Sequence, residues 1–96
     1  MEDHGARLKR LSMRSWRRGT REMDLILGPF ADSELAGMGA EALDAYELLL
    51  EENDQDLYPW VTARLSGGTG GPARHGAMLD RIAAHAQGRL REIRGA

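Results

Sequence analysis

Apolar residues recur at helical spacing along almost the whole chain, and this periodicity limits the available folds more than any other feature. The clearest stripe occupies positions i, i+3, i+4 and i+7 of one segment, and its members are Met23, Ile26, Leu27 and Phe30. Residues that favour strands are scarce, because valine occurs once, at Val61, and no run of β-branched residues is present. The sequence therefore predicts an all-α fold, a small single-domain helical bundle of about five helices over residues 1–96.

Five amphipathic segments supply these helices. The expected ranges, in chain order, are about 5–18, 19 to the Gly28-Pro29 pair, 40–52, 57–65, and 72 or 73 to 94. On the last helix the expected inward stripe is Leu79, Ile82, Ala86, Leu90 and Ile93, with Arg89, Arg91 and Arg94 near its negative end. Because no long heptad seam is present, we expect the bundle to be a monomer.

Three breaks are expected between or within these helices. Gly28-Pro29 should kink or end the second helix, since proline lacks the N–H that the helix needs. Asp56 is expected to be the N-cap of the fourth helix, which would place Pro59 at a position whose N–H has no helical partner. The glycine-rich segment 66–72 is predicted to be a flexible linker with too little apolar surface to pack.

Composition limits where the protein is expected to act. The absence of cysteine excludes a disulfide scaffold and thiolate zinc sites. No apolar run approaches the roughly 18 residues that span a bilayer, so no membrane contact is expected. The chain start lacks the basic and apolar regions of an export signal, and Glu2 and Asp3 argue against a transit peptide. We therefore expect a cytoplasmic location.

The formal net charge of −2 hides a strong segregation of charge along the chain. Residues 1–21 carry +5, residues 22–57 carry −11 without a single Lys or Arg, and residues 58–96 carry +4. Such blocks either create a polarised surface that steers a partner, or face one another and neutralise within the fold. The sequence leaves both arrangements open.

Catalytic residues are thinly represented. The three histidines, His4, His75 and His85, lack the spacing of a metal site or a triad, and we expect them at the surface or half-buried. The glycine-rich segment contains no lysine and does not match a phosphate-binding loop. The sequence therefore favours a protein that is not an enzyme and carries no metal or cofactor of its own.

Nucleic-acid binding is a weaker alternative. The arginine-rich first helix with Trp16 could place cations on phosphates and an indole on a base. The sequence pI is 5.9, however, and the acidic block would repel a polyanion. We expect no nucleic-acid partner.

The most informative segment is a corner at residues 17–24. Arg17, Arg18 and Arg21 gather around Gly19, where glycine permits a tight turn and the close approach of a partner. Glu22 lies at the start of the next helix, where a carboxylate is favourable. The corner is either a well-made helix junction or a recognition surface. The crowding of three arginines at one corner favours the recognition surface, because a stable fold does not require like charges to lie so close together.

These residues resemble a known family. The pattern runs over about residues 7–65 and consists of Arg18-Gly19-x-x-Glu22, then Asp24, Pro29-Phe30, Leu49-Leu50 and Asp54-x-Asp56-Leu57-x-x-Trp60. It is similar to the succinate dehydrogenase assembly factor 2 family, whose bacterial members are the SdhE flavinylation factors. The resemblance implies a monomeric helical bundle that binds the flavoprotein subunit of succinate dehydrogenase, or of fumarate reductase. It further implies that the protein promotes covalent attachment of FAD to a histidine of that subunit.

The resemblance also assigns site residues. Arg18, Gly19 and Glu22 are the motif residues expected near the flavin site of the client, and the flanking contacts are expected to be Trp16, Arg17, Arg21 and Asp24. The protein would act as an assembly chaperone, because positioning a client alone can lower a barrier by several kcal/mol. The alternative function is a small antitoxin-like regulatory module that binds and restrains another protein.

Overall fold

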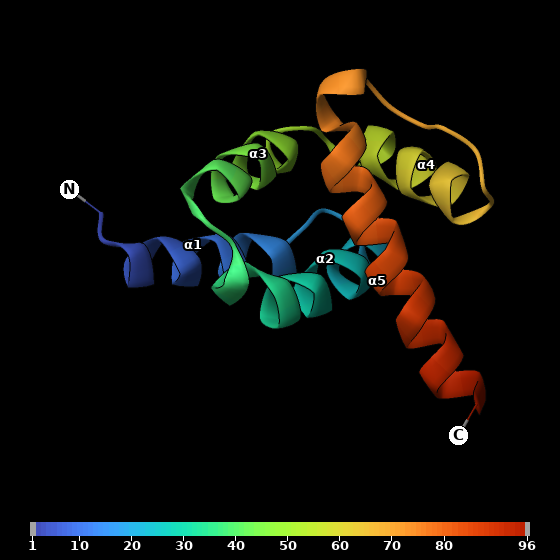
Figure 1. The fold of residues 1–96 in the computed structure, drawn as a ribbon, viewed down its shortest axis with the longest axis horizontal. Coiled ribbons are helices and arrows are strands. Elements are labelled where there is room, and N and C mark those ends of the chain that lie inside the picture. Colours follow the sequence, from blue (N-terminus) through green and yellow to red (C-terminus); the bar gives the residue numbers. More distant parts are fainter. Residues whose placement is uncertain (1, 96) are drawn as a thin grey trace.

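The computed structural model describes residues 2–95, with side chains as far as Arg89. Its elements are α1 (His4–Trp16), α2 (Arg21–Glu34), the 3₁₀ turn η1 (Leu35–Gly37), α3 (Ala40–Leu50), α4 (Asp54–Leu65), the 3₁₀ turn η2 (Ala73–His75) and α5 (Gly76–Gly95). Figure 1 shows α5 crossing the other helices diagonally, with its C-terminal end extending away from them. The described part of the chain contains five α-helices and no strand, so the predicted all-α bundle is confirmed.

The core lies where α2 meets α1, α4 and α5. Its fully buried side chains come from all five helices: Leu11, Met23, Leu27, Phe30, Leu43, Tyr46, Leu49, Leu57, Val61, Leu79 and Ile82. The predicted stripes on the second and last helices therefore face inward, although Ile26 is only half-buried. Leu90, Ile93, Arg91 and Arg94 lie outside the residues whose side chains are described.

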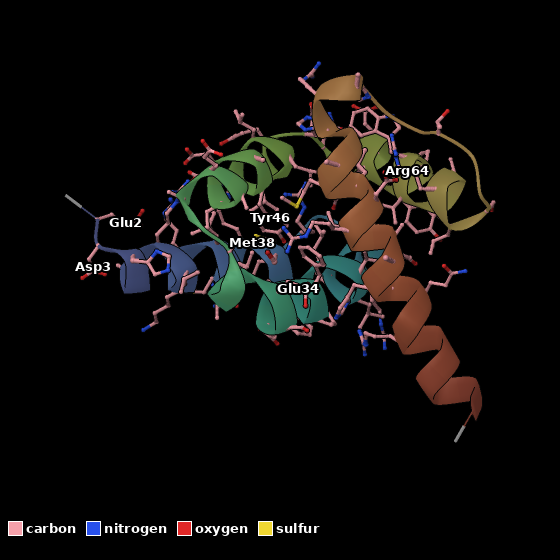
Figure 2. All side chains as sticks on the ribbon, viewed as in Figure 1. Glu2, Asp3, Glu34, Met38, Tyr46 and Arg64 are labelled. Atoms are coloured by element: carbon pink, nitrogen blue, oxygen red, sulfur yellow. The ribbon has the colours of Figure 1, made fainter. Side chains whose placement is uncertain are left out.

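A buried polar pair joins α1 to α3. Tyr46 extends from α3 into the centre of the molecule, where its hydroxyl lies 2.6 Å from Ser15 Oγ (Figure 2). Ser15 Oγ donates to the carbonyl of Leu11 at 2.7 Å, so the tyrosine hydroxyl is the donor to serine. Burial raises the pKa of Tyr46 to about 12, which keeps the phenol neutral.

Helix α2 continues through Pro29 to Glu34, so the predicted end of the helix at this residue is wrong. Proline leaves the carbonyl of Leu25 without its helical donor. Arg89 of α5 donates to that carbonyl at 3.3 Å and replaces part of the lost interaction. Gly28 has a different role, because the ring of Trp16 lies so close that a Cβ there would be 2.3 Å from it.

Helix α4 begins at Asp54 rather than after Asp56, and the predicted N-cap is therefore also wrong. Asn53 is the cap, and its carbonyl accepts from the N–H groups of Asp56 and Leu57, both at 3.0 Å. Pro59 consequently lies well inside the helix, at its sixth position.

The glycine-rich segment packs against α4, so the prediction that it has too little surface to pack is wrong. A Cβ at Gly70 would lie 2.8 Å from the backbone of Trp60, and one at Gly71 would lie 2.9 Å from the Trp60 ring and from Leu79. Arg64, labelled in Figure 2, donates to the carbonyl of Gly70 at 2.9 Å. Glycine is required because only a residue without Cβ fits against the indole. Whether the segment is mobile stays a prediction.

Within residues 2–95, no helix combines the length and apolar composition needed to cross a membrane.

Candidate protein-binding site

Four arginines of the first 18 residues turn toward the acidic segment. The ion pairs join Arg7 to Asp44 and Glu47, Arg10 to Glu2 and Glu47, Arg14 to Glu51, and Arg18 to Asp54, at N–O distances of 2.6 to 3.7 Å. Arg10, and then Arg7, hold the pKa of Glu47 below its ordinary value. The basic and acidic blocks thus neutralise each other in part within the fold, as one of the two sequence alternatives proposed.

Arg18 is the most enclosed of these arginines. Its side chain is 10% exposed, and its Nε donates to Asp54 Oδ1 at 2.8 Å. Nη1 donates to the carbonyl of Leu50 at 2.8 Å, and Nη2 donates to the carbonyl of Glu52 at 2.6 Å. One guanidinium therefore satisfies the carbonyl of the last residue of α3 and a carbonyl of the turn that follows, and it also binds the first residue of α4. It thus holds the α3–α4 turn onto the corner.

Gly19 lets Asp54 approach the corner from the other side. Asp54 Oδ2 accepts from the N–H of Thr20 at 3.0 Å, and a Cβ on Gly19 would lie only 3.2 Å from that oxygen. Gly19 does not have a positive φ, so close approach accounts for the glycine. Thr20 caps α2 by accepting from the N–H of Met23 at 3.3 Å.

Asp24 also forms a hydrogen bond within the corner. Its Oδ1 accepts from the N–H of Arg18 at 2.6 Å. The corner therefore contains the carboxylates of Asp24 and Asp54 as well as Glu22, and Arg18 is paired. The interpretation of Arg18 as part of an unpaired cationic patch is wrong, because that inference considered only residues close in sequence.

The exposed part of the corner consists of Arg17, Arg21 and Glu22. Among the described residues, none of these three side chains makes a hydrogen bond or an ion pair with another group. They lie around the exposed backbone of Gly19, and Arg17 also lines a shallow groove with residues 51–55 of the α3–α4 turn. These three side chains are the ones available to a partner.

Trp16 lies apart from this group. It is 41% exposed, and its indole Nε1 donates to both carboxylate oxygens of Asp32 at 3.2 Å. It lines a second groove with Pro29, Asp32 and His85, between α2 and α5. The structure therefore does not bring Trp16 together with the groove beside Gly19.

Two residues that the sequence analysis did not assign to the site contact the α3–α4 turn or the corner. Asp54 is one of them, although it belongs to the Asp-x-Asp pattern of the resemblance, and Glu52 is the other. The Glu52 carboxylate accepts from Arg74 at 3.0 Å and lies 2.8 Å from His75 Nε2, and the hydrogen bond to His75 is the main cause that lowers the pKa of Glu52. His75 is only 4% exposed, so the prediction that the histidines lie at the surface or half-buried is wrong for it.

The part of the chain with described side chains contains no group of three or more residues able to hold a metal ion. The fold and the corner define the class of protein: a small all-α domain that presents a charged helix junction at its surface.

Comparison with known proteins identifies the family. Residues 9–86 match the family described as flavinator of succinate dehydrogenase, and the chain belongs to this family. The mitochondrial succinate dehydrogenase assembly factor 2 of Cryptococcus neoformans var. neoformans serotype D is 33% identical over 95 residues, which cover 97% of this chain and 52% of the relative. The protein of the same name from Aspergillus terreus is 46% identical over 61 residues, covering 64% of this chain and 21% of the relative.

Debaryomyces hansenii has a further relative of the same name, 47% identical over 53 residues, covering 55% of this chain and 37% of the relative. The chain thus spans between about a fifth and about half of the length of these curated relatives. The resemblance inferred from the sequence is confirmed. The cytoplasmic location predicted from the sequence is contradicted, because all three relatives are named as mitochondrial.

Proposed function

We propose that the protein binds the flavoprotein subunit of succinate dehydrogenase, or of the similar fumarate reductase, and promotes covalent attachment of FAD to it. Membership of the flavinator family supports this function. The observation that carries it is that the residues of the Arg18-Gly19-x-x-Glu22 motif have two different structural roles. Arg18 and Gly19 fix the corner internally through Asp54, and Glu22 is left exposed and unpaired among the described residues.

In this proposal the protein acts by positioning its client. The Arg18–Asp54 pair fixes the junction of α1 and α2 against the α3–α4 turn, so the exposed groups of the corner are held without further loss of backbone entropy on binding. Glu22 then accepts hydrogen bonds from the client, and Arg17 and Arg21 bind its carboxylates. The flavin–histidine bond forms within the client, and the protein needs no cofactor of its own and binds as a monomer.

The test compares two glutamates in equivalent helical positions. Glu22 is the second residue of α2 and Glu41 is the second residue of α3, and both are exposed. Each replacement by alanine removes the same favourable interaction with a helix dipole, about 0.3–1 kcal/mol. The melting temperatures of both variants should therefore fall slightly and by similar amounts. Glu22→Ala should also lower the covalent flavin yield on the purified flavoprotein subunit by about tenfold, as expected for loss of a charge-assisted hydrogen bond.

The yield is read as flavin fluorescence that remains on the denatured subunit in a gel, at equal concentrations of folded protein. Glu41→Ala should give the same yield as the unmodified chain. Equal yields from the two variants would remove Glu22 from the site. A yield that does not depend on adding the unmodified chain would reject the function itself.

A further inference from the structure

Helix α1 has a second cationic side that the fold does not use. The arginines at positions 7, 10, 14 and 18 are all paired with acidic residues. Lys9, Met13 and Arg17 follow one another at intervals of four residues, which places Lys9 and Met13 on one face of α1 and leads to Arg17 just beyond its end. Among the described residues, neither Lys9 nor Arg17 makes an ion pair or a side-chain hydrogen bond. We name these three residues the α1 strip.

The α1 strip is open to solvent. Lys9 and Arg17 are exposed, and Met13, which lies between them, is 44% exposed. All three line one hollow along the side of the helix, together with the paired arginines at positions 10, 14 and 18. The strip continues through Arg17 into the exposed corner, so a partner that contacts Glu22 has the strip directly beside it.

Neither folding nor solubility accounts for the arrangement of Met13 between two exposed cations. Among residues 2–89 the cations of the strip have no partner, and Arg17 lies next in sequence to Arg18, whose guanidinium is almost enclosed and already paired. A large apolar side chain between two cations is poorly suited to a purely solvated face. It suits a surface that receives carboxylates at both ends and an apolar side chain in the middle.

We infer that the α1 strip is a docking surface for an acidic segment of the flavoprotein client, with carboxylates on Lys9 and Arg17 and an apolar side chain on Met13. This inference rests on the proposed function and adds a second contact outside the motif. Eight residues of helix separate the two cations by about 12 Å, a span that suits a peptide segment. A nucleic acid is disfavoured because Glu22 and Glu51 border the same region and would repel its phosphates.

The test uses two variants with the same change in charge on different faces. Lys9→Glu with Met13→Glu alters the strip without touching the corner. Ala77→Glu with Ala84→Glu and Gln87→Glu makes the same change of three charges at exposed positions of α5. Binding to the purified flavoprotein subunit is measured by titration at low and high salt, after melting curves show that both variants are folded.

The strip variant should bind about tenfold more weakly than the α5 variant at low salt, and this ratio should shrink at high salt because exposed charges are screened. At a saturating concentration the strip variant should restore the full covalent flavin yield, because the strip contributes to binding and not to positioning. Glu22→Ala should remain defective at saturation. The difference in flavin yield between the two variants at saturation distinguishes the contact of the α1 strip from the contact of Glu22.

Equal affinities of the strip and α5 variants would overturn the inference while leaving the proposed function intact. Failure of the unmodified chain to bind the subunit would overturn both. The unmodified chain is also titrated with FAD alone and with a short DNA duplex. Binding of either one that depends on Lys9 and Met13 would overturn the assignment of the strip to an acidic protein segment.

Discussion

At the scale of single residues, two adjacent arginines of the corner have opposite roles. Arg17 is exposed and Arg18 is almost enclosed, although both belong to the same basic run. Arg18 has three donors in use toward three different acceptors on the α3–α4 turn. The motif arginine is therefore a positioning residue in this protein. Replacing it would affect a client indirectly, because the replacement would first change the conformation of the corner.

Replacing the two arginines in turn tests this difference. Arg18→Ala should destabilise the fold by about 3 kcal/mol, because it leaves the Asp54 carboxylate, 8% exposed, without its cation. Arg17→Ala should change the free energy of unfolding by less than about 0.5 kcal/mol, as is usual for an exposed side chain. Urea denaturation of both variants measures the two values. A similar small effect at both positions would show that the enclosed pair contributes little.

The sequence predicted that Arg17, Arg18 and Asp24 lie at the corner, but it also expected Trp16 there, did not assign Asp54 to it, and did not indicate which of the arginines faces inward. Arg17 and Arg18 are indistinguishable by composition, and the carboxylate that selects Arg18 lies 36 positions later in the chain. Periodicity could assign Leu11 and Phe30 to the core, because burial of an apolar side chain depends mainly on the helix face it occupies. Pairing of charges depends on how α1 meets the α3–α4 turn, which local patterns do not specify.

At the scale of elements, contacts between segments overrule the local signals for helix ends and loops. The Gly28-Pro29 pair was expected to kink or end α2, but the helix does not end there, and Arg89 of α5 supplies a donor for the carbonyl of Leu25. The glycine-rich segment should not have packed, but Trp60 offers an apolar surface against which glycine fits. In both cases the deciding partner belongs to another element, so composition of the segment alone gave the wrong prediction.

Two glycines of this segment provide a controlled test of its packing. Gly67 and Gly71 both have positive φ, +87° and +84°, so alanine at either position meets the same backbone strain of about 1–2 kcal/mol. Only at Gly71 would the new Cβ also collide, at 2.9 Å, with the ring of Trp60 and with Leu79. Gly71→Ala should therefore lower the melting temperature clearly more than Gly67→Ala does. Equal shifts would indicate that the segment moves away from Trp60 freely.

At the scale of the whole molecule, ion pairs connect α1 to α3, and the end of α3 to the segment before α5. Arg7 and Arg10 of α1 reach Glu47 of α3, and Glu52 after α3 reaches Arg74 and His75 before α5. Each of these acidic groups has a pKa below its ordinary value, because a hydrogen bond from a basic side chain favours the charged form. The charge blocks of the sequence thus contribute to the assembly of the helices, and the cations of α1 that are unpaired among the described residues form the docking surface that we propose.

Stability should consequently fall in acid, and Glu47 provides the test. The unfolded chain, in which Glu47 has the ordinary pKa of a glutamate, takes up a proton at a higher pH than the folded chain does. The stabilisation is present in full above that value and is lost as the pH falls through the lowered pKa of the folded state. Glu47→Gln should therefore lower the melting temperature at pH 7, and the difference from the unmodified chain should shrink as the pH falls below the ordinary pKa of a glutamate.

Glu41→Gln is the control for this measurement, because Glu41 is exposed and makes no ion pair with any residue in the described range. It should change the melting temperature at pH 7 only slightly. Melting curves of the three proteins, recorded by circular dichroism at intervals from neutral to acid pH, give the comparison. If the curves for the unmodified chain and Glu47→Gln stay parallel throughout, the contact between α1 and α3 does not depend on the charge of Glu47, and the remaining contacts, among them the Tyr46–Ser15 hydrogen bond and the Arg7–Asp44 ion pair, hold these two helices together.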